Sequence, residues 1–235
     1  MGSRSRRNRQ VDESMDVDEE PFGSRHQLML QYLLHERMIK KVDLIRVHRD
    51  LFEGESELQS VLATITTKIK PLKMDIKQVI CDLTGETYFV LFQTTGESFF
   101  PKCCIFTTSQ LEFIKQIIIG IVLSTDGAVG KIQSINSCKT MSKSEAGDAI
   151  EYFVKEKIFM EVSKLGLCLS PLAVVEFEPY LRTGFDGNLL VCDLCKQLVF
   201  VGKTCDNCEQ KVHLHCLDKW IKSERSECPL CHHKL

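Results

Sequence analysis

Four pairs of metal-binding residues near the carboxyl end constrain the fold of this chain more than any other feature. Two residues separate the members of each pair, a spacing that lets one tight turn aim both side chains at a single metal ion. Four pairs supply eight ligands, enough for two tetrahedral zinc sites, but the spacing alone leaves open which pairs share an ion. The pairs are Cys192 with Cys195, Cys205 with Cys208, His213 with Cys216, and Cys228 with Cys231.

Two zinc ions in this segment are expected to be structural. Eight protein ligands fill both tetrahedra, so neither ion keeps the open position that a catalytic zinc offers to water. The binding free energy would fold a segment that holds too few apolar residues for a stable core of its own. His215 is a rival ligand, but it directly precedes Cys216 and cannot easily share an ion with it, so we favour His213.

The remaining cysteines and the composition point to a reduced, intracellular compartment. The chain has 12 cysteines, and none of the five outside the pairs has a recognisable activating neighbour, so we interpret them as reduced thiols without a catalytic role. No apolar run approaches the roughly 20 residues of a membrane span, and no secretory signal is present. The formal net charge of -2 gives no global attraction to nucleic acid. The five cysteines are Cys81, Cys103, Cys104, Cys138 and Cys168.

The amino-terminal residues differ in composition from the rest of the chain. Residues 1–24 hold a cluster of arginines and then a run of carboxylates with few apolar side chains, which predicts a disordered tail. Residues 25–106 begin with three segments of apolar residues at helical spacing, the third ended by Pro71. Residues 74–81 and 87–93 are then predicted as two β-strands around a turn. Three helices followed by a β-hairpin is the order of a winged-helix domain.

Residues 107–184 follow the same plan without repeating the same residues. Thr108 or Ser109 is expected to cap a helix, and Ser142 is expected to cap a later one. Across residues 25–184, apolar residues exceed what two small cores need, and we expect a partner chain to cover part of that surface. Nearly contiguous among them are Ile117, Ile118, Ile119 and Ile121.

A second hairpin and a last helix complete this region. Strands are predicted at 159–163 and 167–169, and a helix at 171–180 leads to the zinc-binding segment, residues 185–235. The predicted fold class is therefore α+β, with two tandem winged-helix domains followed by a small two-zinc finger.

The ligand order of four cysteines, one histidine and three cysteines resembles the variant RING fingers of ubiquitin ligases. Such fingers carry an apolar residue before the second ligand, a tryptophan between the sixth and seventh, and a proline after the seventh; Leu194, Trp220 and Pro229 match. The resemblance implies a cross-brace, in which the first pair joins the third and the second joins the fourth. Zinc 1 would be held by Cys192, Cys195, His213 and Cys216, and zinc 2 by Cys205, Cys208, Cys228 and Cys231.

PHD fingers share this ligand order and are the main alternative, as readers of histone tails without catalysis. They usually place an aromatic residue two positions before the seventh ligand, where this chain has Ser226, and no second aromatic completes a cage for a methylated lysine. We therefore favour the RING interpretation. His232 departs from active RING ligases, which often carry an arginine there, and imidazole lacks the multi-donor fork of guanidinium. Ligase activity is expected to be weak or to depend on a partner.

Across residues 25–235 the chain is similar to the RING-like "non-SMC element one" subunits of the DNA-repair complex of structural maintenance of chromosomes (SMC) proteins. The specific segments are Cys205-Asp-Asn-Cys208, Val212-His-Leu-His-Cys216 and Cys228-Pro-Leu-Cys231. In that family the winged-helix half binds a MAGE-type subunit, and the pair joins a kleisin to bridge the heads of the SMC heterodimer. The resemblance implies a location in the nucleus, on the chromosome.

The implied function is that of a RING-type E3 ubiquitin-protein ligase subunit for DNA repair and genome maintenance. The finger would supply no nucleophile and would instead position a ubiquitin-charged conjugating enzyme. Leu194 and Trp220 can equally be needed to fill the small core of the finger. The alternative function is a non-enzymatic structural or DNA-binding subunit of the same complex, with DNA near Lys40, Lys41, Arg46 and Arg49. The expected contacts of the conjugating enzyme are Leu194, Trp220, Pro229 and His232.

Overall fold

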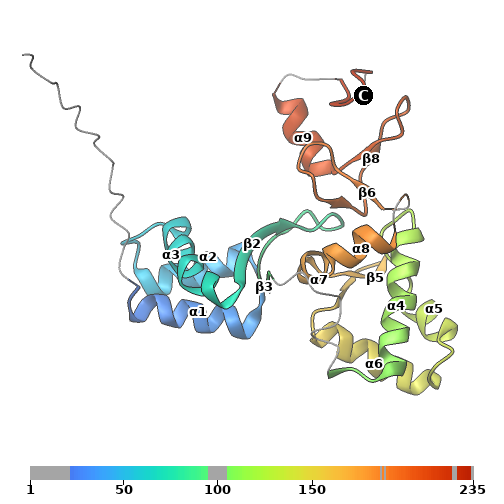
Figure 1. Ribbon diagram of the computed structural model, residues 1–235, viewed down its shortest axis with the longest axis horizontal. Helices are drawn as coiled ribbons and strands as arrows, with labels where there is room; N and C mark the ends of the chain where they lie inside the picture. Colours follow the sequence, from blue (N-terminus) through green and yellow to red (C-terminus); the bar gives the residue numbers. More distant parts are fainter. Residues whose placement is uncertain (1–21, 95–104, 186, 188, 224–226, 234–235) are drawn as a thin grey trace, which may run out of the picture.

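Three consecutive parts make up the chain in a computed structural model, and Figure 1 shows the first at the left, the second at the lower right and the third above it. We call them the first unit (22–94), the second unit (105–185) and the finger (187–233). Most of the predicted tail, residues 1–21, lies outside the described residues, and helix α1 begins at Ser24. Within the described part, no helix is both long and apolar enough to cross a bilayer. The described residues are 22–94, 105–185, 187, 189–223 and 227–233.

The first unit packs its helices against one face of a three-stranded antiparallel sheet with strand order β1-β3-β2. Met29 and Leu33 lie one turn apart on α1 and are buried in the same core as Ile39 and Phe89, which are paired across two strands. Strand β1 was not predicted from the sequence, because three residues are too few to show an alternating pattern. The elements are α1 (Ser24–Glu36), β1 (Met38–Lys40), α2 (Lys41–Phe52), α3 (Leu58–Ile69), the 3-10 helix η1 (Lys70–Leu72), β2 (Met74–Ile80) and β3 (Thr87–Gln93).

The second unit has three helices, a hairpin and two short helices. The helix predicted at 171–180 is two helices, because Phe177 leaves helical geometry between them, with φ of −95° and ψ of 2°. The predicted hairpin is present, with ends that differ by one residue from the prediction. The elements are α4 (Thr108–Leu123), α5 (Lys131–Ser137), α6 (Lys143–Lys155), β4 (Phe159–Val162), β5 (Gly166–Leu169), α7 (Pro171–Glu176) and α8 (Glu178–Gly184).

Helix α4 is capped one residue earlier than predicted. The hydroxyl of Thr107 accepts the N–H of Gln110 at 3.2 Å, and the side chain of Gln110 accepts the N–H of Thr107 at 2.9 Å. The prediction of Thr108 or Ser109 was wrong, because several hydroxyl residues in a row all fit the same capping pattern. Ser142 is confirmed as the cap of α6.

The isoleucine run of α4 belongs to the core of the second unit. Ile117, Ile118 and Ile121 are buried, and only Ile119 of the four is substantially exposed, at 43%. This run therefore contributes little to the apolar surface for which a partner chain is expected. The buried isoleucines form the inner face of α4, which is covered by α6, by the β4–β5 hairpin and by residues of the finger.

The finger consists of two short hairpins and one helix. The first ligand pair lies between β6 and β7, the second between β8 and β9, the third at the start of α9, and the fourth beyond α9. Val199 and Val212 are buried in a small apolar cluster beside two of the metal-binding cysteines. The elements are β6 (Leu190–Val191), β7 (Leu198–Val199), β8 (Lys203–Thr204), β9 (Lys211–Val212) and α9 (Leu214–Lys222).

The three parts share buried surface. Leu198 and Phe200 of the finger lie in the same apolar cluster as the core of the second unit. The β2–β3 hairpin reaches from the first unit toward α7 and the finger (Figure 1), and Val90 on its outer face packs with Leu172 of α7. Arg37 of the first unit also donates to Glu176 of α7 at 2.6 Å. The first unit is therefore fixed against the second, and the second against the finger.

Candidate metal centre

Two clusters of metal-binding side chains form in the finger from alternate ligand pairs. Within each cluster, the ligand atoms of the four side chains all lie within 4.8 Å of one another. The first pair lies with the third and the second with the fourth, which is the grouping that a cross-brace implies. His215 belongs to neither cluster; its ring stacks on that of His213 at 4.7 Å. The clusters are Cys192, Cys195, His213 and Cys216, and Cys205, Cys208, Cys228 and Cys231.

Three of the four pairs share one backbone turn. In each, the residue after the second cysteine has a positive φ, of 61°, 59° and 58° in chain order, and its N–H bonds back to the carbonyl of the first cysteine. This turn folds the chain tightly enough to aim both sulfur atoms at one point. The N–H donors are Lys196, Glu209 and His232, and the acceptors are Cys192, Cys205 and Cys228.

The separations between ligand atoms fit a tetrahedral zinc ion. Zinc–sulfur bonds of about 2.3 Å place tetrahedral ligands about 3.7 Å apart. We interpret the short contacts in both clusters as edges of such tetrahedra rather than as hydrogen bonds. The edges are 3.6 Å for Cys205–Cys231, 3.7 Å for Cys208–Cys228, and 3.3 and 3.7 Å from Nδ1 of His213 to Cys195 and Cys216.

Ionisation of the thiols also favours a bound cation. Burial and the neighbouring cysteines raise the pKa of Cys216. A hydrogen bond from the Asn207 side chain and the N–H of His233 lower the pKa of Cys231 to about 6. Four such groups cannot all be thiolates without a positive charge between them, whereas coordination to a divalent cation deprotonates each thiol. The donor sets, one of three sulfurs and one nitrogen and one of four sulfurs, suit zinc.

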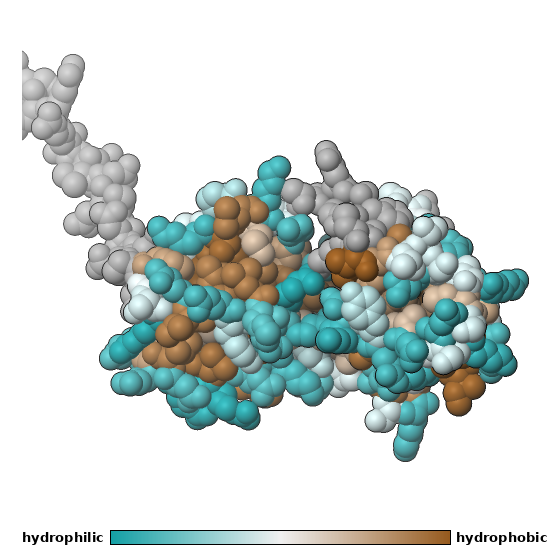
Figure 2. All heavy atoms as spheres, turned by 90° about the horizontal axis from the view of Figure 1, so that it is seen from below, coloured by the Kyte–Doolittle hydropathy of each residue, from teal (hydrophilic) through white to brown (hydrophobic). Residues whose placement is uncertain are grey.

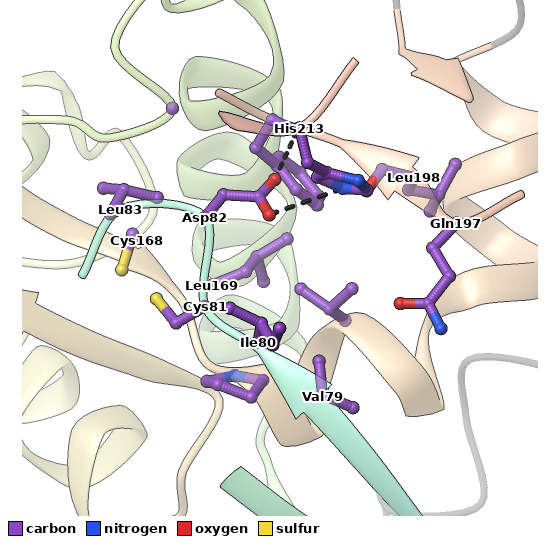
Figure 3. A pocket seen from close by; sticks show the side chains of 14 residues that line it. Val79, Ile80, Cys81, Asp82, Leu83, Cys168, Leu169, Gln197, Leu198 and His213 are labelled. Carbon is purple, nitrogen blue, oxygen red and sulfur yellow. Dashed lines mark hydrogen bonds and ion pairs between the residues drawn. The ribbon is translucent and has the colours of Figure 1, made fainter. Parts of the chain in front are cut away.

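A carboxylate of the first unit lies behind the histidine ligand. Asp82, in the β2–β3 turn, is 8% exposed, and its Oδ1 is 3.4 Å from Nε2 of His213 (Figure 3). Its Oδ2 accepts the N–H of Phe200 at 3.0 Å. Burial raises the pKa of Asp82, while His213, the Phe200 and Val201 N–H groups and Lys211 oppose that rise. Asp82 was not predicted from the sequence, since 118 residues separate it from Phe200.

The residues expected to contact a conjugating enzyme lie around the two clusters. Leu194 is half-buried against the apolar cluster of the finger, and Pro229 is half-buried in the fourth ligand pair. Trp220 is half-buried too, and its indole N–H donates to the carbonyl of Glu227 at 2.8 Å. That bond ties α9 to the loop before the fourth pair, a structural contact that the sequence did not indicate. His232 is exposed.

Helix α9 exposes apolar side chains that were not among the residues predicted from the sequence. Leu214 and Ile221 are 50% and 51% exposed. They are seven residues apart and share one face of the helix, roughly opposite the face that carries Cys216 and Trp220. Leu230, inside the fourth ligand pair, is 51% exposed. Metal binding does not require these three, and their spacing on α9 was a signal available in the sequence.

The basic residues considered for DNA contact are partly neutralised. Lys40 donates to Glu86 at 2.7 Å, and Arg46 lies 3.6 Å from Asp43. A positive patch at the start of α2 is therefore weaker than the sequence alone suggests.

Comparison with known proteins gives two family matches. Residues 192–231 match the RING-like domain, and residues 26–147 match the Nse1 non-SMC component of the SMC5-6 complex. The second match covers more than half of the chain. The chain belongs to the Nse1 family. This confirms the family resemblance inferred from the sequence.

Similar proteins cover nearly the whole chain. Proteins named "Non-structural maintenance of chromosomes element 1 homolog" from Bos taurus and Homo sapiens are 24% and 23% identical over 219 residues, 88% of this chain and 82% of theirs. A homolog from Drosophila melanogaster is 23% identical over 191 residues, 78% of this chain and 80% of its own. A chain of a solved Nse1-Nse3-Nse4 complex aligns with a TM-score of 0.76 and 22% identity, over 92% of this chain and 97% of its own. The likeness shows the fold, mixed α/β with a RING-like finger at the carboxyl end.

Proposed function

We propose that both clusters bind zinc and that the finger is the RING-type module of an E3 ubiquitin ligase subunit. The observation that carries this proposal is the cross-brace grouping of the eight ligands. A finger built from sequential pairs would instead place Cys192 and Cys205 in one cluster. Both tetrahedra are complete, so zinc supplies folding free energy and no water-activating site.

In this role the finger accelerates ubiquitin transfer by positioning. The reactive thiolate belongs to the conjugating enzyme, and a substrate lysine is the nucleophile. Leu194, Trp220 and Pro229 would contact the enzyme, with His232 beside them and the exposed Leu230 extending the apolar surface. Holding the charged enzyme in a reactive orientation converts a loose encounter into a productive one.

The two units in front of the finger are proposed to be winged-helix domains, with boundaries at 25–106 and 107–184. The strand order β1-β3-β2 in the first unit is that of a winged helix. In the second unit a single residue, Val129, takes the place of the first strand: it exchanges both backbone hydrogen bonds with Leu167 of β5, at 2.9 and 2.8 Å. The tail (1–24) and the finger (185–235) complete the proposed division.

The proposed assembly is a nuclear, chromosomal complex with a MAGE-type subunit, a kleisin and an SMC heterodimer. Family membership and the likeness to a chain of the Nse1-Nse3-Nse4 complex support it. Figure 2 shows apolar side chains gathered on the first unit, over the side where Figure 1 places α1. We propose that this surface takes part in binding the MAGE-type subunit. The exposed large apolar residues on α1 and α2 are Leu28, Leu34, Val42 and Ile45.

A purely structural role is the second candidate, and one observation favours it. Leu198 and Phe200 of the finger are buried in the core of the second unit, so zinc would stabilise the platform that its partners bind whether or not ubiquitin is transferred. DNA contact at α2 belongs to this candidate.

Reconstituted ubiquitin transfer with the MAGE-type partner and a panel of conjugating enzymes separates the two roles. Truncating a buried interface tryptophan costs about 2 kcal/mol or more, some thirtyfold in affinity, so Trp220→Ala should lower enzyme binding and transfer together. Trp220→Phe is the matched control, because it removes the indole bond to Glu227 but keeps most of the apolar area. Zinc content and partner binding should be unchanged in both variants. Transfer that is unaffected by Trp220→Ala would contradict the ligase proposal, and release of the partner with no transfer to lose would support the structural role.

A further inference from the structure

Asp82 lies where an ionised carboxylate is stable only if neighbouring groups compensate its charge. It is nearly fully buried at the tip of the β2–β3 hairpin, away from the core of its own unit. An ionised side chain in such a place requires charged or hydrogen-bonding partners. The finger supplies them: Nε2 of His213 at 3.4 Å, the N–H of Phe200 at 3.0 Å and the N–H of Val201 at 3.5 Å.

The geometry of His213 shows which ring atom faces the metal position. Nδ1 is the atom within 3.3 Å of Cys195 and 3.7 Å of Cys216, so it is the ligand atom. Nε2 then carries the proton and donates it to the carbonyl of Leu198 at 2.9 Å, with Asp82 close behind. A histidine whose second nitrogen is held in this way keeps its tautomer and ring orientation, and a carboxylate behind it raises its basicity toward a metal.

Asp82 lines a small cavity of about 40 Å³ where the three parts of the chain meet. Three segments meet there: the β2–β3 turn, the loop at Gly127 and the strand-to-loop passage at Phe200 (Figure 3). A Cβ added to Gly127 would lie 2.7 Å from the side chain of Val201 and 3.6 Å from that of Leu83. Gly127 of the second unit therefore lies between the β2–β3 turn and the finger, at a point where a larger side chain would not fit.

We propose that Asp82 is a positioning residue for the first metal site and that it couples metal binding by the finger to docking of the β2–β3 turn. The proposal rests on the zinc binding put forward under Proposed function. Coupling of two binding events is reciprocal, so the turn strengthens metal binding as much as the metal strengthens docking of the turn. In the part of the chain that the structure describes, the second cluster has no histidine and no contact of this kind with the first unit. Only one of the two zinc ions should therefore respond.

Competition between the zinc-loaded full chain and a chelator tests this inference. Asp82→Ala should lower the affinity for one zinc ion by about tenfold to a hundredfold, the range found when the partner of a metal-binding histidine is removed. The affinity for the other zinc ion should stay at its wild-type value. Asp82→Asn, which keeps the shape and an acceptor for Phe200 but loses the charge, should have a smaller effect. Glu86→Gln is the matched control, because that carboxylate is in the same hairpin and contacts Lys40 and Tyr88 of the first unit.

Hydrogen exchange of the wild-type chain gives the reciprocal measurement. Removing zinc should speed amide exchange at Phe200 and in residues 79–88, relative to the same peptides of the zinc-loaded chain. Zinc affinities of both Asp82 variants equal to wild type would overturn the inference, even if the variants melt earlier, since that result assigns Asp82 a packing role only. A purified chain that binds no zinc would instead overturn the proposed function and this inference with it.

Discussion

At the scale of single residues, the surroundings of Cys168 keep it an unreactive thiol. Cys168 lies in β5 with its thiol against the carbonyl of Met160, and burial, together with nearby Cys81, raises its pKa to about 12. At neutral pH it is a thiol and a poor nucleophile, in agreement with the expectation of a reduced cysteine without a catalytic role.

Alkylation of the native, zinc-loaded chain at pH 8 tests this assignment. Cys168 should react much more slowly than the half-buried Cys138, because both access and thiolate population are low, and the two should react alike after denaturation. Mass spectrometry of the labelled peptides measures both. Equal labelling in the native chain would show that β5 opens or that Cys168 is activated.

At the scale of elements, the contact between α7 and the first unit includes one buried acid, Glu176. Burial raises the pKa of Glu176 to about 7, although Arg37 at 2.6 Å opposes the rise. The folded pKa exceeds the unfolded value, so protonation of Glu176 contributes stability that is fully present below about pH 4.5 and is lost as the pH rises through about 7.

Glu176→Gln isolates this contribution, since glutamine stays neutral at every pH. The free energy of unfolding of the wild type, relative to the variant, should increase by about 1 kcal/mol when the pH is lowered from 8.5 to 6. Denaturant titrations of both proteins at the two pH values, with zinc retained, measure it. A difference that does not change with pH would mean that Glu176 has an ordinary pKa in the folded chain.

The elements also show what the sequence could predict and what it could not. Long amphipathic helices and the β2–β3 hairpin were predictable because their periodicity runs over many residues. The strand β1 and the bridge at Val129 were not, since they are three residues and one residue long and are selected by tertiary pairing. The candidate metal ligands were readable from spacing alone, whereas Asp82 was not, because its contact with His213 forms only when the first unit docks on the finger.

At the scale of the whole molecule, the finger and the two units share buried surface. Three separate domains, as predicted from the sequence, would let the finger unfold while the other domains kept their structure. Phe200 in the core of the second unit and Asp82 behind His213 change that expectation for the first cluster. Loss of the first zinc should loosen the second unit and the β2–β3 turn, whereas loss of the second zinc should stay within the finger.

Zinc stoichiometry of paired cysteine variants tests the cross-brace, on which the account of the finger depends. Native mass spectrometry of the wild-type chain should find two zinc ions. Cys205→Ser with Cys228→Ser should retain one ion, because both residues lie in the second cluster, and Cys192→Ser with Cys205→Ser should lose both, because each cluster then lacks a ligand. One retained ion in the Cys192 and Cys205 variant, together with none in the Cys205 and Cys228 variant, would show sequential pairing and contradict the account.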